Sequence, residues 1–82
     1  MIKFKLNKEK FLKSTDDFLI EEDFEIVFCI EEVYFNDVRI EWNDGYIDYT
    51  REEIVECFRD GWWLDVSDEE DVELKKEIGL IE

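Results

Sequence analysis

Carboxylates are the side chains in this sequence best able to do chemistry, because twenty-five acidic residues stand against ten basic ones and no histidine. Carboxylates act as general acids and bases, bind divalent cations and pair with guanidinium groups. The lack of histidine removes the usual general base near neutral pH and nearly every standard zinc site. The chain also has no P-loop, GxSxG or HExxH motif. We therefore expect no catalytic residues, no cofactor and a protein that is not an enzyme.

Cation binding and glycoside hydrolysis remain as weaker alternatives for the carboxylates. Asp16 and Asp17, together with the acids of 21–23, offer many oxygens to a divalent cation. The EF-hand spacing with its central glycine is absent, however, so we expect no metal site. Paired carboxylates also hydrolyse glycosides. A chain of 82 residues rarely forms the enclosing cleft that such an enzyme needs.

The net charge of −15 narrows the range of partners. Direct binding to nucleic acid requires lysine and arginine to replace counterions, so this chain is not expected to bind it. The charge also argues against anionic membranes, and no apolar run is long enough to cross one. The N-terminus lacks the apolar core of a signal peptide, which favours a cytoplasmic location and reduced thiols at Cys29 and Cys57.

The charge is unevenly distributed along the chain. Residues 1–13 hold five lysines against Glu9 alone, whereas residues 14–82 hold twenty-four acids against five bases. No linker or internal repeat divides the sequence, so we expect a single acidic α+β domain over 1–82. The basic segment is expected to lie away from any surface on which the acids act, or to anchor the strands.

A hairpin is the clearest local signal. Asp44-Gly45 as a two-residue turn is typical of type I′ hairpins and joins strands over 38–42 and 46–49. This register places Glu41 opposite Asp48, and like charges directly opposite are unfavourable in a sheet. We therefore expect an acidic outer face, with the pairs Trp42–Ile47 and Ile40–Tyr49 on the other.

Two helices follow the hairpin. Thr50 with Glu53 forms a capping box at the start of the first, and Gly61 is suited to its end. Ser67 with Glu70 predicts a second capping box, for a helix that ends at Gly79. The first helix places Ile54, Val55, Cys57 and Phe58 on one side, and an acidic row of Glu52, Glu56 and Asp60 on the other.

The remaining pattern sets the fold class. Alternating residues 2–6 predict a first strand, and the β-branched and aromatic run 24–30 predicts a central one. Residues 8–22 fit either a short helix or an irregular strand. Because strands come first and helices last, we expect an α+β fold, with a three- or four-stranded antiparallel sheet and C-terminal helices packed on one face. Trp62 and Trp63 are expected to cover the core after the helix, an exposed tryptophan being the alternative.

Nucleic-acid mimicry accounts best for so many carboxylates on a small folded scaffold. Duplex DNA carries one negative charge per ~1.7 Å of its axis, and fixed rows of carboxylates occupy the same cationic groove. A chain that needs only solubility requires a net charge of magnitude roughly 2–8. The alternative is a plain acidic interaction protein, whose acids would be spread evenly over the surface, whereas a mimic is expected to present one contiguous acidic face.

The stretch Arg39–Asp71 resembles small acidic anti-CRISPR inhibitors from prophages of Gram-positive bacteria. The shared features are an arginine-bearing strand, a turn with a return strand, a helix, and acids at like spacing. They comprise Arg39, Asn43-Asp44-Gly45, Tyr46, Ile54-Val55-Glu56, Phe58-Arg59-Asp60-Gly61-Trp62, Asp65 and Asp68-Glu69-Glu70. Residues 1–35 do not match the family.

The resemblance implies a partner and a mechanism. The partner is a guide-loaded CRISPR effector nuclease of type II, inside a bacterial host cell, and the inhibitor occupies the site that reads the short PAM duplex. Asp68 and Glu69 would meet the PAM-reading arginines, and Asp65 would support these two residues. The candidate partner-binding set is completed by the further acids Glu70, Glu52, Glu56 and Asp60. The tip formed by Asn43, Asp44, Gly45 and Tyr46 would reach toward the nuclease centre. We further expect a monomer. A DNA mimic aimed at a restriction or DNA-repair enzyme is the alternative within this class.

Overall fold

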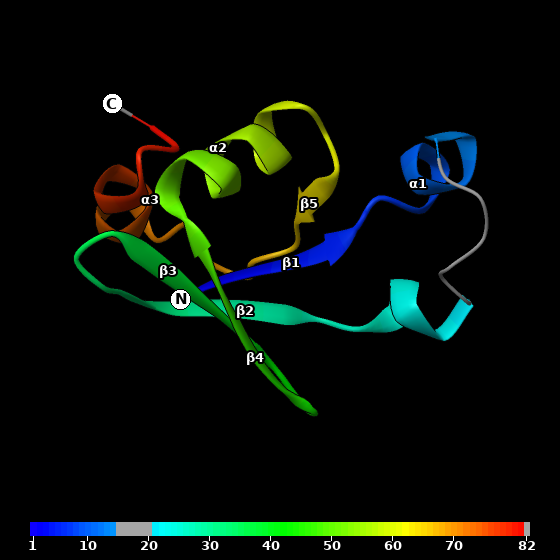
Figure 1. Cartoon of the computed structure of the whole chain (residues 1–82), viewed down its shortest axis with the longest axis horizontal. Helices are drawn as coiled ribbons and strands as arrows, with labels where there is room; N and C mark the ends of the chain where they lie inside the picture. The colour runs from blue at the N-terminus through cyan, green and yellow to red at the C-terminus, as the bar shows by residue number, and fades with distance from the viewer. Residues whose placement is uncertain (15–20, 82) are drawn as a thin grey trace.

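The fold is a five-stranded antiparallel sheet with two helices on one side and two short helices at one end (Figure 1). A computed structural model describes residues 1–14 and 21–81. In chain order the elements are β1 (Ile2–Leu6), α1 (Lys8–Ser14), the 3-10 helix η1 (Glu21–Glu25), β2 (Phe28–Val33), β3 (Asp37–Trp42), β4 (Gly45–Thr50), α2 (Arg51–Arg59), β5 (Trp63–Asp65) and α3 (Val72–Ile78). The strands lie in the order β4-β3-β2-β1-β5.

The α+β class and the antiparallel sheet are confirmed, but the expected number of strands is wrong. The extra strand, β5, is only three residues long and pairs with β1, placing Trp63 opposite Leu6. A three-residue strand shows too little alternation to be recognised in a sequence. Its pairing depends on β1, which lies almost sixty residues earlier in the chain.

The predicted strand over 24–30 is also partly wrong. The strand begins at Phe28, and Phe24 instead lies in η1, where its buried ring packs against Phe11 of α1. This contact with α1 outweighs the strand preference of the apolar run. The prediction that the run supplies a central strand is confirmed, because β2 has two neighbours on one side and two on the other. Asp16, Asp17, Phe18 and Leu19 lie outside the described residues.

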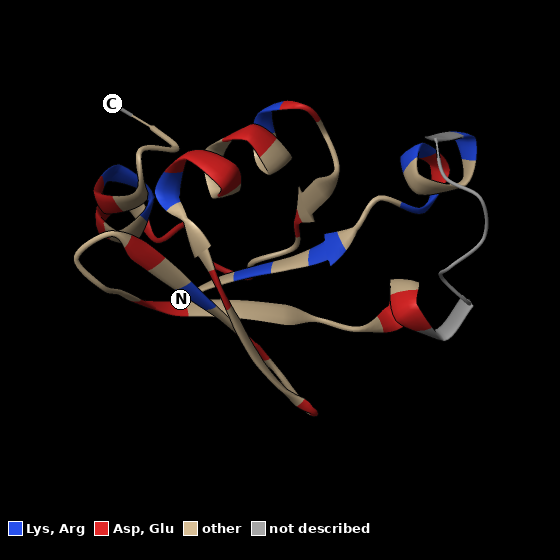
Figure 2. Ribbon diagram, viewed as in Figure 1, with Lys and Arg blue, Asp and Glu red and all other residues tan. Residues whose placement is uncertain are grey.

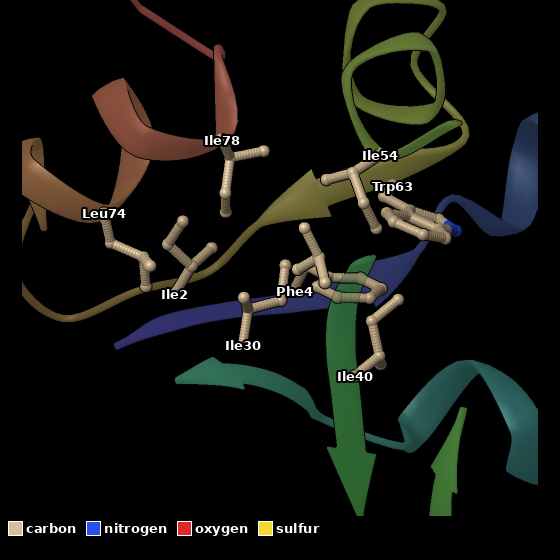
Figure 3. Packing of buried hydrophobic residues seen from close by; sticks show 9 residues of the cluster. Ile2, Phe4, Ile30, Ile40, Ile54, Trp63, Leu74 and Ile78 are labelled. Atoms are coloured by element: carbon tan, nitrogen blue, oxygen red, sulfur yellow. The ribbon is translucent and has the colours of Figure 1, made fainter. Parts of the chain in front are cut away.

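The core lies between the sheet and the helices α2 and α3 (Figure 3). Ile2 and Phe4 point to this side from β1, because alternate residues of a strand share a face. Ile54 of α2 and the pair Leu74 and Ile78 of α3 close the core from above. Lys3 and Lys5 consequently lie on the opposite, helix-free face of the sheet.

The hairpin is present, but its predicted register is wrong. Asn43 and Asp44 form the turn, and Gly45 is already paired with Trp42. Ile40 therefore lies opposite Ile47, and Arg39 lies opposite Asp48. This register replaces the expected Glu41–Asp48 repulsion by an ion pair, which is the more favourable cross-strand arrangement.

The helix ends follow local rules in three places out of four. Thr50 and Glu53 form the predicted capping box, with the Glu53 backbone N–H donating to Thr50 Oγ1 at 3.2 Å. Gly61 follows α2 with φ +82°, and Gly79 ends α3 with φ +103°, both conformations that favour glycine. The Ser67–Glu70 box is wrong, because Asp71 caps α3. Ser67 Oγ instead accepts a hydrogen bond from the Lys3 backbone N–H at 2.9 Å.

Trp62 and Trp63 both pack against the core, as expected. Trp63 is buried, and its ring stacks on Phe4 with 4.3 Å between ring centroids. Trp62 is half-buried and packs edge-on against Phe11 of α1. Lys10 lies over the same indole ring, 4.6 Å from its centroid. Trp62 thereby joins α1 to the start of β5.

Candidate partner-binding surfaces

The predicted binding residues fall into three groups on different elements. We call them the hairpin tip (Asn43, Asp44, Gly45 and Tyr46), the helix row (Glu52, Glu56 and Asp60) and the acidic loop (Asp65, Asp68, Glu69 and Glu70). All of these residues are exposed. The hairpin tip and α2 lie on opposite sides of the molecule in Figure 2. The described groups therefore do not form the one contiguous acidic face expected of a mimic, and one flat partner surface cannot contact both the hairpin tip and α2.

Arg39 organises the base of the hairpin tip. Its Nε and Nη2 donate to the two carboxylate oxygens of Asp48 at 3.0 and 3.3 Å. The guanidinium lies between two aromatic rings, 4.0 Å from the centroid of Tyr46 and 5.0 Å from that of Tyr34. Stacking on aromatic rings and a bidentate pair with a carboxylate together fix the orientation of a guanidinium group. The hydrogen bonds from Arg39 lower the pKa of Asp48, so this carboxylate is neutralised by a cation of the same hairpin.

The helix row lies along the solvent side of α2. Its members are separated by four residues, which places them about 6 Å apart along the helix axis. Bases interrupt the acids of this surface: Arg59 Nε is 3.6 Å from Asp60 Oδ1, and Lys10 donates a hydrogen bond to the Asp60 carbonyl oxygen. The row is therefore a set of spaced carboxylates with cationic neighbours at its C-terminal end.

The acidic loop is held at both ends by ion pairs. Lys75 Nζ of α3 is 2.8 Å from Asp65 Oδ2 and 3.6 Å from Glu70 Oε1, and only 15% of the Lys75 side chain is exposed. The Asp65 carboxylate also accepts the Ser67 backbone N–H at 2.9 Å. At the other end Asp71 binds the N-terminal amino group of Met1. The loop is thus fastened to both α3 and β1.

Asp68 and Glu69 remain available to a partner. Asp68 is 89% exposed, and its carboxylate is 3.7 Å from Lys3 Nζ. Glu69 makes no ion pair with any described residue. The two side chains line a shallow hollow of about 620 Å³. Its lining residues are Met1, Lys3, Ser67, Asp68, Glu69, Glu70, Asp71, Val72 and Glu73. An open hollow with acidic walls is suited to a cationic side chain.

The charges on Asp65 and Lys75 are stabilised by their contact. Partial burial alone would raise the pKa of Asp65, but the hydrogen bonds from Lys75 and Ser67 outweigh it and hold that pKa below its usual value. The same contact with Asp65 raises the pKa of Lys75. Asp65 therefore stabilises the loop through Lys75 and Ser67, and its role in supporting Asp68 and Glu69 at a partner stays a prediction.

The stability contributed by Asp65 should be lost in acid. A carboxylate whose pKa is lowered by folding stabilises the folded state above its unfolded pKa of about 3.9, and the benefit disappears as pH falls through the lower, folded value. Asp65→Asn should therefore destabilise the protein by on the order of 1 kcal/mol at neutral pH. The difference from the unsubstituted protein should shrink at about pH 3 and below. Urea unfolding of both proteins at neutral pH and at about pH 3 measures this difference in the free energy of unfolding.

Comparing the two proteins at each pH cancels the general effect of protonating the other acids. Asp68→Asn is the matched control, because it removes an exposed carboxylate and should change stability by less than about 0.5 kcal/mol. A destabilisation by Asp65→Asn that stays constant from neutral to acidic pH would contradict the assigned ion pair.

Three of the five lysines of the basic segment lie at the end of the molecule that carries α1 (Figure 2). Lys8, Lys10 and Lys13 belong to α1, at the opposite end from α3. Lys3 and Lys5 lie on the helix-free face of β1. Lys10 helps to anchor α1, through its contacts with Asp60 and Trp62. The acids of η1 lie at the same end, so this end is not a positive pole of the molecule.

Three groups that hold the candidate binding surfaces in place were not identified from the sequence. The role of Arg39 follows only from the correct hairpin register, which the repulsion expected between Glu41 and Asp48 could have signalled. The roles of Lys75 and of the Met1 amino group depend on contacts between elements far apart in the chain. No local pattern reports such contacts.

Metal binding, membrane insertion and thiol reactivity have little support among residues 1–14 and 21–81. No group of three or more acidic, cysteine or histidine side chains is placed to hold a metal ion there, and no helix there has the length and apolar character needed to cross a membrane. Cys29 and Cys57 are both free thiols. Burial, followed by the charge of Glu53, raises the pKa of Cys57, which disfavours the reactive thiolate.

Comparisons with known proteins add no relative to these observations. Searches with protein-family models, with curated proteins and with solved structures each found no match to the chain.

Proposed function

We propose that this protein is a non-enzymatic inhibitor that takes the place of DNA in a CRISPR effector nuclease. The observation that carries the proposal is the acidic loop. Asp68 and Glu69 stand exposed beside a hollow with acidic walls, on a loop fastened by the ion pairs of Asp65 and Asp71. Carboxylates on a fixed frame pair with arginine forks as phosphates do.

The inhibitor acts by occupying the PAM-reading site. An effector of type II first reads a short PAM in duplex DNA through arginine side chains, and guide pairing begins only afterwards. Asp68 and Glu69 would accept hydrogen bonds from those arginines and leave no room for the duplex. Target recognition would then stop at its first step. The resemblance of Arg39–Asp71 to anti-CRISPR inhibitors supports this partner.

The separation of the acidic groups suits a partner that surrounds the inhibitor. The helix row and the hairpin tip face opposite sides, whereas nucleases of this class hold nucleic acid in a positively charged channel. A channel contacts more than one side of its occupant. The acidic loop would meet the PAM-reading arginines, while the hairpin tip would extend toward the nuclease centre.

A plain acidic interaction protein is the second candidate, and the same separation favours it. Acids lie on the hairpin, on α2 and in the loop before α3 rather than on one continuous face. Such a protein would bind basic surfaces of many kinds, with little preference for a site that recognises DNA. Competition by DNA of defined sequence therefore separates the two functions.

A competition experiment tests the proposal. The protein is immobilised and exposed to a guide-loaded type II nuclease, with PAM-containing duplex DNA or the same duplex without a PAM as competitor. We expect binding of the nuclease, displacement by the PAM duplex, and at least about tenfold weaker displacement by the other duplex, since tenfold corresponds to about 1.4 kcal/mol.

Three outcomes would count against the proposal. Equal displacement by both duplexes would favour a plain acidic interaction protein. Binding that no duplex affects would exclude the PAM site. No binding to the nuclease, together with capture of a restriction or DNA-repair enzyme that DNA displaces, would keep the mimicry and change the target.

A further inference from the structure

Strand β4 is an unprotected sheet edge. It lies at one end of the strand order, is six residues long, and begins at the tip of a hairpin that projects beyond the rest of the sheet (Figure 1). Natural proteins usually block such edges with lysine, proline, a bulge or a very short strand. The strand GYIDYT contains no lysine and no proline. The opposite edge, β5, is only three residues long.

The free edge presents backbone groups that fit another strand. The two-residue turn is closed by the Trp42–Gly45 pair, and hydrogen-bonded and non-hydrogen-bonded pairs alternate from there along an antiparallel ladder. Gly45, Ile47 and Tyr49 therefore direct their backbone groups toward β3. Those of Tyr46 and Asp48 point outward.

Charge indicates that the strand which pairs with this edge belongs to a second copy of the chain. Two molecules that each carry −15 repel one another at most contacts. In β4 the only acid is Asp48, and Arg39 of the same hairpin neutralises it through two hydrogen bonds. This edge is thus a place where two copies approach without adding unpaired charge.

Instead of the expected monomer, we propose that two copies of the chain pair antiparallel through β4 and form a continuous sheet across a twofold axis at Ile47. In this register Tyr46 lies opposite Asp48 of the second copy, and each such pair exchanges both of its backbone hydrogen bonds. Ile47 lies opposite its own counterpart in the intervening pair, where side chains come closest. Its side chain, which is 43% exposed in the single chain, gains an apolar neighbour.

The dimer should form more readily as salt increases, because salt screens the repulsion between the two acidic bodies. We expect sedimentation equilibrium of concentrated protein to give the mass of one chain at about 20 mM NaCl and to approach twice that mass at about 0.5 M NaCl. The backbone amides of Tyr46 and Asp48 should exchange more slowly with solvent under the second condition. Salt has the opposite effect on binding to a cationic nuclease, and dimerisation requires no nuclease, so the two proposals can fail separately.

Ile47→Lys tests the proposed axis. It should abolish the dimer by placing two ammonium groups against each other, even though it lowers the net negative charge and so weakens the general repulsion. Leu64→Lys is the matched control, because Leu64 is similarly exposed at 47%, lies on the other edge strand and gives the same change of charge. It should leave the dimer intact. Circular dichroism checks that both variants are folded.

Two results would overturn the proposal. One is a single-chain mass at every salt and protein concentration. The other is an equal response of the mass to Ile47→Lys and to Leu64→Lys, whether both variants dimerise or neither does.

Discussion

The double substitution Asp68→Lys with Glu69→Lys is expected to weaken binding to a guide-loaded nuclease at least about tenfold, which corresponds to about 1.4 kcal/mol or more. Both side chains project from the acidic loop into solvent, so their replacement removes no core contact. In the complex each lysine would face a PAM-reading arginine, and like charges brought together at an interface are strongly unfavourable. Calorimetric titration measures the affinity, and inhibition of DNA cleavage measures its consequence.

A matched variant separates this local effect from the loss of total charge. Glu31→Lys with Asp37→Lys also changes the net charge from −15 to −11. Both residues are exposed and lie on β2 and β3, outside the three candidate groups. This control should weaken binding several times less than the loop variant. Equal losses would mean that the nuclease responds to overall charge, and Asp68 and Glu69 would then have no specific role.

Phe4→Ala should cause the largest loss of stability, about 3–5 kcal/mol. Phe4 is 1% exposed and stacks between two rings, with centroid distances of 4.3 Å to Trp63 and 5.2 Å to Phe28. Phe58 of α2 packs against it edge-on at 5.5 Å. Figure 3 shows the Phe4 ring among side chains from the sheet and from α2. Alanine would leave a cavity between three aromatic rings that cannot all move inward.

Phe35→Ala is the control, since the Phe35 side chain is 91% exposed. We expect its effect to stay within about 0.5 kcal/mol. Chemical unfolding followed by tryptophan fluorescence reports both variants, because Trp63 lies against the deleted ring. A loss below about 1 kcal/mol for Phe4→Ala would show that the core does not centre on this residue.

The parts of the fold that could be predicted from the sequence are those set by near neighbours. The start of α2 depends on Thr50 and Glu53, and the end of α3 depends on Gly79. Both signals lie within one helical turn of the feature that they determine. The antiparallel α+β class was predictable for a related reason, because strand-like segments precede helix-like ones.

The errors arise where distant residues decide the structure. Asn-Asp and Asp-Gly are both acceptable turn sequences, so the hairpin register is set by the pairing of Arg39 with Asp48 and of Ile40 with Ile47. Ser67 was predicted to cap a helix from its spacing to Glu70, but its hydroxyl oxygen accepts a hydrogen bond from the Lys3 backbone N–H. For the candidate surfaces, the sequence identified the exposed acids. It could not identify the contacts of Lys75 and Met1 that hold the acidic loop.

The acids of η1 lie at the same end of the molecule as the lysines of α1, so the two ends of the molecule are not poles of opposite charge. In the field of a cationic cleft the protein is therefore attracted through its net negative charge rather than turned by a torque along its length. Ions in the medium reduce that attraction, so the association rate constant should fall with salt more steeply than the dissociation rate constant rises.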